Sequence, residues 1–331
     1  MMMHRPFANF SMFNEKKSVS EANSDIGSGT QVIDRLPKQA VWFFAFAIAL
    51  TLAFAKPLFE MLRFSFDTDL HSHAILIPLI TAYLIWSRRK QPVPVPASSP
   101  VLAVVPLAVG LVALKAVLFP NAEMAAAKPN DYLALTTFGY VSLLWAGALW
   151  FLGGRFLRGF AFPAAFLVFM VPMPTVVENA VEVFFQHTSA DATAVLFSLS
   201  GMTYYREGLV FELPGIALQV AQECSGIRSS LVLIITSLLA GHLFLQTPQR
   251  RWVLTLCVIP LAIVRNAFRI VTIGFLCVHV DPAMIDSWIH HRGGPLFFAL
   301  SLIPFFLLLF WLCRNERRRG HPKPSGNQGS T

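Results

Sequence analysis

Runs of apolar residues follow one another along most of the chain, with only short polar stretches between them. A helix that spans a bilayer needs about 20 predominantly apolar residues. Eight segments reach or approach that length: 40–55, 73–86, 101–119, 133–152, 160–171, 229–245, 252–278 and 296–312. The pattern therefore predicts an all-α, polytopic membrane protein with about eight transmembrane helices in one bundle. The fifth segment is short and also fits a re-entrant segment, which would change the count.

Composition supports a membrane protein. Hydrophobic residues make up 55% of the chain and charged residues only 13%, whereas about 25% charged residues is usual in soluble domains. We expect one transmembrane domain over residues 39–313, because the apolar segments leave no room for a second globular unit. Segments 1–38 and 314–331 are polar, and we expect both to be disordered and cytoplasmic. The first lacks an apolar core followed by a cleavage site, so no cleavable signal peptide is predicted.

The basic residues indicate how the helices are oriented. The chain has 26 Lys and Arg residues and a net charge of +8, and most of these cations lie in short clusters between the apolar runs. Cytoplasmic loops of membrane proteins carry an excess of Lys and Arg. Placing the N-terminus inside puts most of the cations on the cytoplasmic side, which predicts that both termini are cytoplasmic. The clustering and the lack of a phosphate-binding loop argue against a nucleic-acid or nucleotide partner.

One of the four cysteines differs from the others in its surroundings. Cys257, Cys277 and Cys313 lie among apolar residues, where a thiol is usually inert packing. Cys224 has polar neighbours, in the stretch QECSGIR. A disulfide between Cys224 and Cys277 is an alternative, because the outer face is oxidising. The spacing fits no zinc site, and no metal or organic cofactor is implied.

The residues after Cys224 favour a reactive thiol. Ser225 and Gly226 are expected to begin the helix of segment 229–245, whose first free amide groups, near Ser229, would point toward the outer surface. A helix N-terminus carries about half a positive charge and lowers the pKa of a nearby thiol. Because the thiolate is the nucleophilic form, this placement would activate Cys224.

The seventh apolar segment contains three polar residues, Arg265, Asn266 and Arg269. A charged side chain at the bilayer centre costs roughly 2.5–3.5 kcal/mol, so it usually faces the bundle interior and has a function. Arg265 and Arg269 are one helical turn apart and share a face. Alternatives remain open: Arg269 as a structural ion pair with Glu223 or Asp286, and Asn266 as a helix-helix contact.

The stretch SWIHHRGGP, before the last apolar segment, places two histidines at the outer mouth of the bundle. A histidine there can accept a proton from a thiol. Adjacent residues on a helix do not point the same way, and we favour His290, because Gly294 four residues later offers a place for close approach. His291 is the alternative. His71 and His73 are interpreted as structural or as residues that support the site from outside it.

Several of these stretches together are similar to the exosortase/archaeosortase family of multi-pass membrane cysteine transpeptidases. The resemblance rests on ECSGIRSS (223–230), NAFR (266–269) and His290 with Gly294, and the supporting runs are SHAILIPLITAYLIWSRR and FPAAFLVFMVPMP. It covers most of residues 36–313. The resemblance implies Cys224 as nucleophile, Arg269 as essential arginine and His290 as the catalytic histidine. The expected supporting residues are Ser225, Gly226, Arg228, Asn266 and His291.

The resemblance also implies a function and a place for it. We expect a peptidase or transpeptidase in the bacterial inner membrane, with its active site at the periplasmic face. Its partners would be membrane-anchored proteins whose C-terminal sorting signal carries a Pro-Glu-Pro-like (PEP-CTERM) motif, together with the lipid bilayer and an unidentified acceptor.

Two other classes of function stay open. A transporter or flippase for an anionic lipid or saccharide would use Arg265 and Arg269 to bind the anion and would not need Cys224. A non-catalytic component of an exopolysaccharide export system would depend on no single residue.

Overall fold

The computed structural model describes residues 38–88, 97–119, 128–220, 226–286 and 293–320. Within these ranges, six segments are long and apolar enough to cross a membrane, and two bent helix pairs raise the number to eight if each pair is one span. The prediction of an all-α polytopic protein with about eight transmembrane helices is confirmed. The six segments are Leu70–Ser87, α5 (Pro100–Leu118), α7 (Pro129–Phe151), α11 (Ile227–Phe244), α12 (Pro248–His279) and Gly294–Arg318 of α14 (Gly294–Gly320).

The two bent pairs explain why the count is not fixed. The helices α2 (Lys38–Ala53) and α3 (Ala55–Asp67) meet at 69°. Segment Ala161–Met170, made of α9 (Ala161–Phe166) and η2 (Leu167–Met170), meets α10 (Thr175–Ser200) at 91°. The short fifth apolar segment therefore ends at a sharp bend.

Most predicted helix boundaries agree with the structure to within a few residues. One reason is that Pro100, Pro129 and Pro248 stand in the first turn of α5, α7 and α12. Proline has a fixed φ suited to a helix and lacks an N–H that would have no partner there. The second predicted segment is a 3-10 helix, η1 (Asp69–Ile75), followed by α4 (Leu76–Ser87). At the chain ends, α2 begins at Lys38 and α14 continues to Gly320, past the predicted domain end.

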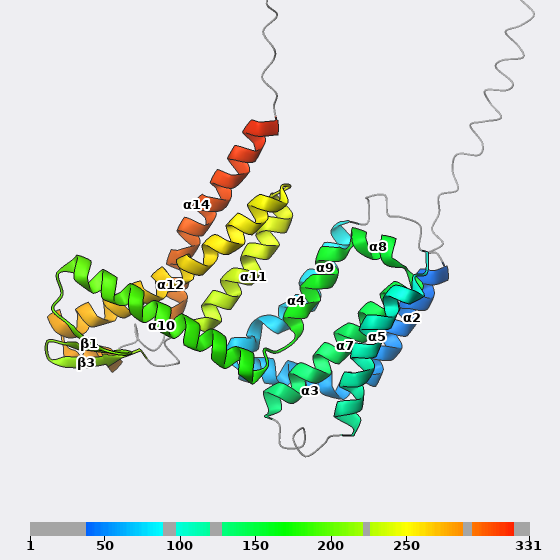
Figure 1. The fold of residues 1–331 in the computed structure, drawn as a ribbon, viewed down its shortest axis with the longest axis horizontal. Coiled ribbons are helices and arrows are strands. Elements are labelled where there is room, and N and C mark those ends of the chain that lie inside the picture. Colours follow the sequence, from blue (N-terminus) through cyan, green and yellow to red (C-terminus); the bar gives the residue numbers. More distant parts are fainter. Residues whose placement is uncertain (1–37, 89–96, 120–127, 221–225, 287–292, 321–331) are drawn as a thin grey trace, which may run out of the picture.

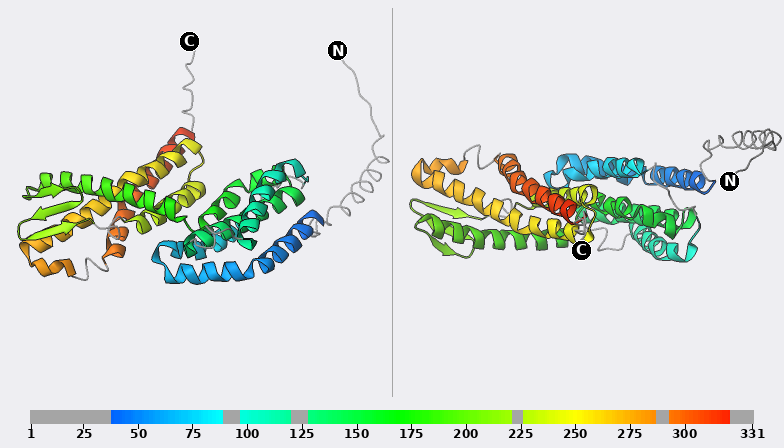
Figure 2. Two further views of the ribbon diagram at one scale, coloured as in Figure 1. Left: turned by 60° about the horizontal axis from the view of Figure 1, so that its bottom comes forward. Right: turned by 90° about the horizontal axis from the view of Figure 1, so that it is seen from above.

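The helices form two groups that share contacts (Figure 1). One group holds α2 to α9, including the short helix α8 (Gly154–Gly159), and the other holds α10 to α14. Ile235 of α11 belongs to the same apolar cluster as Ile77 of α4 and Met170 of η2. This cluster joins the two groups, and Figure 2 shows them side by side in two further views.

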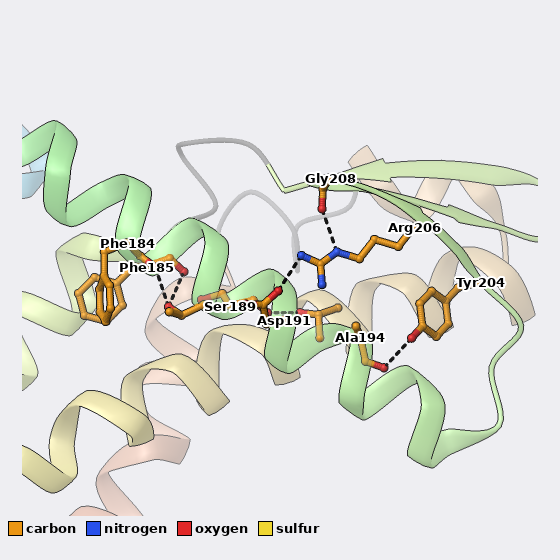
Figure 3. A network of polar contacts seen from close by, with 10 residues as sticks. Phe184, Phe185, Ser189, Asp191, Ala194, Tyr204, Arg206 and Gly208 are labelled. Carbon is orange, nitrogen blue, oxygen red and sulfur yellow. Dashed lines mark hydrogen bonds and ion pairs between the residues drawn. The ribbon is translucent and has the colours of Figure 1, made fainter.

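A small antiparallel sheet follows α10 and was not expected from the sequence. Its strands, in the order β1-β2-β3, are Tyr205–Glu207, Val210–Leu213 and Ile216–Gln219. The turns contain Gly208 at φ 59° and Gly215 at φ 85°, where glycine avoids the penalty of a side chain. Figure 3 shows the sheet against α10: Arg206 donates to Asp191 at 2.8 Å, and the Tyr204 hydroxyl donates to the Ala194 carbonyl at 3.1 Å.

The bend before α10 is held by polar side chains from other elements. Pro172 and Pro174 interrupt the helix because they lack an N–H. Met173 lies between the two prolines. The Met173 N–H donates to His71 Nε2 at 3.2 Å, and the Met173 carbonyl accepts from Asn130 Nδ2 at 2.8 Å. The His71 side chain is 2% exposed. This contact agrees with the structural role expected for His71.

Arginine side chains bind backbone carbonyls at one end of the bundle. We call the end where α2 begins and α14 finishes the tail end, and the end where α12 finishes beside the sheet the sheet end (Figure 1). At the tail end, Arg88 donates to the Gly159 carbonyl at 2.6 Å, and Arg250 donates to the Leu312 carbonyl at 2.9 Å. Both arginines thus bind carbonyls of neighbouring helices.

Candidate functional site

The site is built on the first turn of α11. Gly226 precedes this helix with φ 73° and ψ 15°, in the left-handed region. Its carbonyl accepts hydrogen bonds from the Ser229 hydroxyl at 3.1 Å and from the Ser230 hydroxyl at 2.8 Å, and the Ser230 N–H donates to it at 3.0 Å. The helix therefore begins where the sequence places it, directly after the stretch that contains Cys224.

Gly226 lies against the polar residues of α12. A Cβ atom added at Gly226 would lie 2.9 Å from Arg265 Nη2 and 2.9 Å from Asn266 Oδ1. Arg265 Nη2 donates to the Gly226 carbonyl at 3.2 Å and to Ser230 Oγ at 3.4 Å. Two motifs that are 39 residues apart in the chain are thus in direct contact.

The arginines of α12 differ in their position along the helix. The Arg265 and Asn266 side chains are buried, at 8% and 2% exposure, and Arg269 is half-buried. Arg269 lies one turn further toward the sheet end, a rise of about 6 Å. Since α11 and α12 are consecutive and Leu233 packs with Leu254 and Val258, the two helices run antiparallel. The turn of α12 that contains Arg269 therefore lies nearer the sheet end than Gly226, on the side from which the chain approaches the start of α11.

The beginning of α14 reaches the same turn of α12. The rings of Phe268 and Phe297 pack edge to face with centroids 6.2 Å apart. The third motif of the sequence, SWIHHRGGP, leads directly into this part of α14. The stretches around Cys224, Arg269 and His290 are therefore joined to three helices that meet at one level of the bundle.

Four of the expected site residues lie outside the described residues, namely Cys224, Ser225, His290 and His291. Arg228 is described and exposed on the first turn of α11. A Cβ added at Gly294 would meet no described atom within 4 Å, and the choice between His290 and His291 stays a prediction. The alternative ion pairs of Arg269 involve Glu223 and the Asp286 side chain, which also fall outside the description.

The stretch containing Cys224 is anchored on both sides. It begins after Val220, which is fully buried. The Val220 N–H donates to the Leu209 carbonyl at 2.9 Å, and its own carbonyl accepts from Gln186 Nε2 at 2.6 Å. It ends at Gly226, whose carbonyl accepts a hydrogen bond from Arg265 Nη2. Both anchors belong to buried, hydrogen-bonded parts of the fold.

The cysteines other than Cys224 lie within helices α12 and α14. Cys257, Cys277 and Cys313 are free thiols, and Cys277 is buried in the cluster that joins α10, the sheet and α12. The described ranges contain no group of three or more His, Cys, Asp and Glu side chains suited to a metal. The chemistry available at the described part of the site is cationic and hydrogen-bonding.

Three residues of this arrangement were absent from the sequence-based site. The sequence predicts that Arg265 lies inside the membrane, but it does not predict the contact with Gly226. Ser230 was only part of a motif, and Gln186 lies in a stretch without a predicted element. The spacing of four residues between Arg265 and Arg269 is the sequence pattern that could have identified Arg265. No comparable pattern identifies Gln186.

The fold and the site define a multi-pass helical membrane protein in which Gly226, the residue that follows Cys224 and Ser225 in the chain, contacts an arginine-bearing helix. The family model described as transmembrane exosortase (Exosortase_EpsH) matches residues 62–307, and the chain belongs to this family. The match runs from α3 into α14 and includes all three motifs. It confirms the family resemblance. No curated protein and no solved structure gives a significant match to the chain.

Proposed function

We propose that this exosortase is a cysteine transpeptidase or peptidase that cleaves C-terminal sorting signals of membrane-anchored proteins, with Cys224 as nucleophile. Family membership supports a membrane transpeptidase or protein-sorting role in general. The observation that carries the residue assignment is the contact of Gly226 with Arg265 and Asn266, one turn from Arg269. Two residues of extended chain reach about 7 Å, so connectivity keeps Cys224 close to Gly226.

The proposed reaction proceeds through a thioester. The Cys224 thiolate attacks the carbonyl carbon of the scissile peptide bond, and the oxygen becomes an oxyanion. Arg269 and the first amides of α11 stabilise this charge. When the carbon–nitrogen bond breaks, His290 gives a proton to the leaving amine. An acceptor amine or water then attacks the thioester and gives a proton back to His290, and the Cys224 thiolate is released.

We further propose that the sheet end faces the periplasm and the tail end faces the cytoplasm of a bacterial inner membrane. The support is the distribution of charge: Arg88, Arg155, Arg158, Arg250 and Arg251 belong to segments at the tail end, and cytoplasmic loops are rich in such residues. In this orientation Cys224 acts on exported substrates. The transmembrane unit is assigned to residues 39–313.

Processing of a tagged substrate, followed as a shift in gel mobility, tests the residue assignment. We expect Cys224→Ala to abolish processing. Arg269→Lys keeps the charge but loses the planar fork of donors, and we expect it to lower the rate about 10²–10³-fold, as for loss of an oxyanion donor. Cys257→Ala is the control and should process normally.

Full processing by Cys224→Ala would refute the nucleophile. If Cys224 is dispensable while variants of Arg265 and Arg269 lose function, the chain instead binds an anionic lipid or saccharide, as in the transporter alternative.

A further inference from the structure

Helix α10 is long enough to cross a bilayer but turns sharply away from the segment before it. Its 26 residues give a length of about 39 Å at 1.5 Å per residue. The bend between segment Ala161–Met170 and α10 measures 91°. A helix that crosses the membrane must have its two ends at opposite ends of the bundle, so the positions of the ends of α10 show whether it crosses.

The first turn of α10 is bound to the first turn of α7. The Thr175 N–H donates to Asp131 Oδ1 at 2.7 Å. Asn130 Nδ2 donates to Glu178 Oε2 at 2.9 Å. The start of α10 therefore lies at the same end of the bundle as the start of α7.

Helix α7 begins at the sheet end because it runs antiparallel to α2. The Thr51 and Tyr140 hydroxyls are hydrogen-bonded at 3.0 Å, and a Cβ added at Gly147 would contact the Phe46 ring. Residue numbers thus fall along α2 as they rise along α7. Since α2 begins at the tail end, the first turn of α7 lies at the sheet end, and so does the first turn of α10.

The last turn of α10 lies at the sheet end as well. A Cβ added at Gly274 would lie 2.9 Å from Phe197 Cζ. Gly274 is close to the end of α12 at His279, and α12 finishes at the sheet end. Both ends of α10 are therefore at one end of the bundle, and Figure 1 shows the helix extending from the group of α2 to α9 across to the sheet.

Helix α10 carries an exposed apolar stripe, which we define as Val177, Phe184, Val195 and Leu199. These four side chains are 48–78% exposed within the described structure. Their spacing places them on one face of the helix. On a neighbouring face, His187 and Asp191 are exposed, and Asp191 accepts a hydrogen bond from Arg206 of the sheet. Separate apolar and polar faces are typical of a helix that lies in the surface of a bilayer.

The apolar stripe is continuous with the lipid-facing surface of α12. Leu199 lines a groove of about 630 Å³ between α10 and α12, together with Phe268, Phe275 and Val280 of α12. The groove follows α12 from Val280 to Phe268, about 18 Å toward the tail end. Its described lining contains no Lys, Arg, Asp or Glu. Because α12 is a membrane-crossing segment, lipid is the apolar partner that borders the groove.

We propose that α10 is an in-plane helix that binds the bilayer surface at the sheet end through the apolar stripe and does not cross the membrane. Lipid acyl chains fill the groove between α10 and α12. The face that carries Asp191 points to water, together with the sheet. This placement goes beyond the proposed function and does not depend on which residue is the nucleophile.

Electron paramagnetic resonance of the full chain in vesicles of phosphatidylethanolamine and phosphatidylglycerol tests this placement. The native cysteines are replaced by alanine, and a single nitroxide label is attached through one cysteine substitution at a time. Oxygen concentrates in lipid and a nickel complex in water, so the access of each reagent to the label gives its depth. The variants on the apolar stripe are Val177→Cys, Phe184→Cys, Val195→Cys and Leu199→Cys.

Three exposed positions provide the controls. His187→Cys lies on the polar face of α10, Val112→Cys near the middle of α5 and Glu207→Cys in β1. We expect all four labels on the apolar stripe to prefer oxygen and to lie at one depth, about 5–10 Å into the boundary between headgroups and acyl chains. The label at His187 should prefer the nickel complex. Val112→Cys should give the deepest label, and Glu207→Cys a label in water.

A gradient of depth along the apolar stripe would overturn the inference. If α10 crossed the membrane, Val177 and Leu199 would differ in depth by about 33 Å. Labels on the stripe that prefer the nickel complex would also overturn it, since they would lie in water. Labels shielded from both reagents would do the same, since protein and not lipid would then cover the stripe.

If the chain without its native cysteines does not fold, photo-cross-linking of the chain with all its cysteines decides. A diazirine amino acid replaces Phe184 in one sample and His187 in the other, and mass spectrometry detects the attached lipid. We expect lipid to attach at position 184 in large excess over position 187. Equal attachment, or attachment to protein alone, would overturn the inference. Neither measurement uses a substrate, so both are independent of whether Cys224→Ala still processes one.

Discussion

Gly226 is the residue at which the motifs of the candidate site meet. Its positive φ lets the chain turn into α11, and its lack of a side chain lets Arg265 and Asn266 approach to contact distance. Either requirement alone would favour glycine. Together they explain why the sequence has glycine at the entrance to this helix.

Gly226→Ala and Gly201→Ala separate the two requirements. Both glycines have nearly the same φ, 73° and 74°, but an added Cβ at Gly201 meets no described atom within 4 Å. The left-handed conformation costs a non-glycine residue about 1–2 kcal/mol, so both variants should lower the thermal midpoint. We expect Gly226→Ala alone to lose most processing, because its Cβ displaces Arg265 and Asn266. Equal processing by the two variants would show that the close approach is unimportant.

For single residues, the sequence indicates which side chains have the chemistry of a reactive site. It does not indicate which of these side chains are in contact. The polar neighbours of Cys224 and the three polar residues of an apolar span are enough to single out candidate reactive groups. The hydrogen bond from Arg265 to Gly226 joins residues 39 positions apart. No local pattern encodes such a pairing, since it depends on how α11 packs against α12.

Among the elements, the helices follow from the apolar runs, but α10 and the sheet do not. Helix α10 mixes apolar residues with Glu178, Glu182, His187 and Asp191, so it lacks the continuous apolar run of a simple span. The three strands have three or four residues each. Short strands give too little alternation to identify, although Pro214 and Gly215 form a turn signature.

Helix α10 stabilises the chain just before the candidate site, because Gln186 Nε2 donates a hydrogen bond to the Val220 carbonyl. The bond is 2.6 Å long and buried. Replacing Gln186 by leucine leaves a buried carbonyl without this donor, at a cost of about 1–3 kcal/mol. We expect Gln186→Leu to lower the thermal midpoint and slow processing. Gln219→Leu, on the exposed side of β3, makes the same chemical change and should alter neither; equal effects would remove the anchoring role of Gln186.

On the scale of the whole molecule, the bundle brings together three stretches that are distant in the chain. Antiparallel packing of α11 on α12 places the entrance of α11 beside the Arg269 side of α12, and Phe268 and Phe297 join the start of α14 to the same turn. The membrane character of the chain and the approximate number of its spans could be predicted from hydropathy. The bends in α2–α3 and before α10 could not, since the second of them depends on distant partners such as His71 and Asn130.

The central claim is that Cys224 forms a covalent bond with the substrate. Its most direct test is mass spectrometry of the full-length protein quenched in acid during processing of a tagged substrate and then digested. The account predicts a thioester adduct on the peptide that contains Cys224, carrying the N-terminal part of the cleaved substrate and increasing when the acceptor is withheld. Continued processing with the adduct on another residue, or with none on any cysteine, would contradict it.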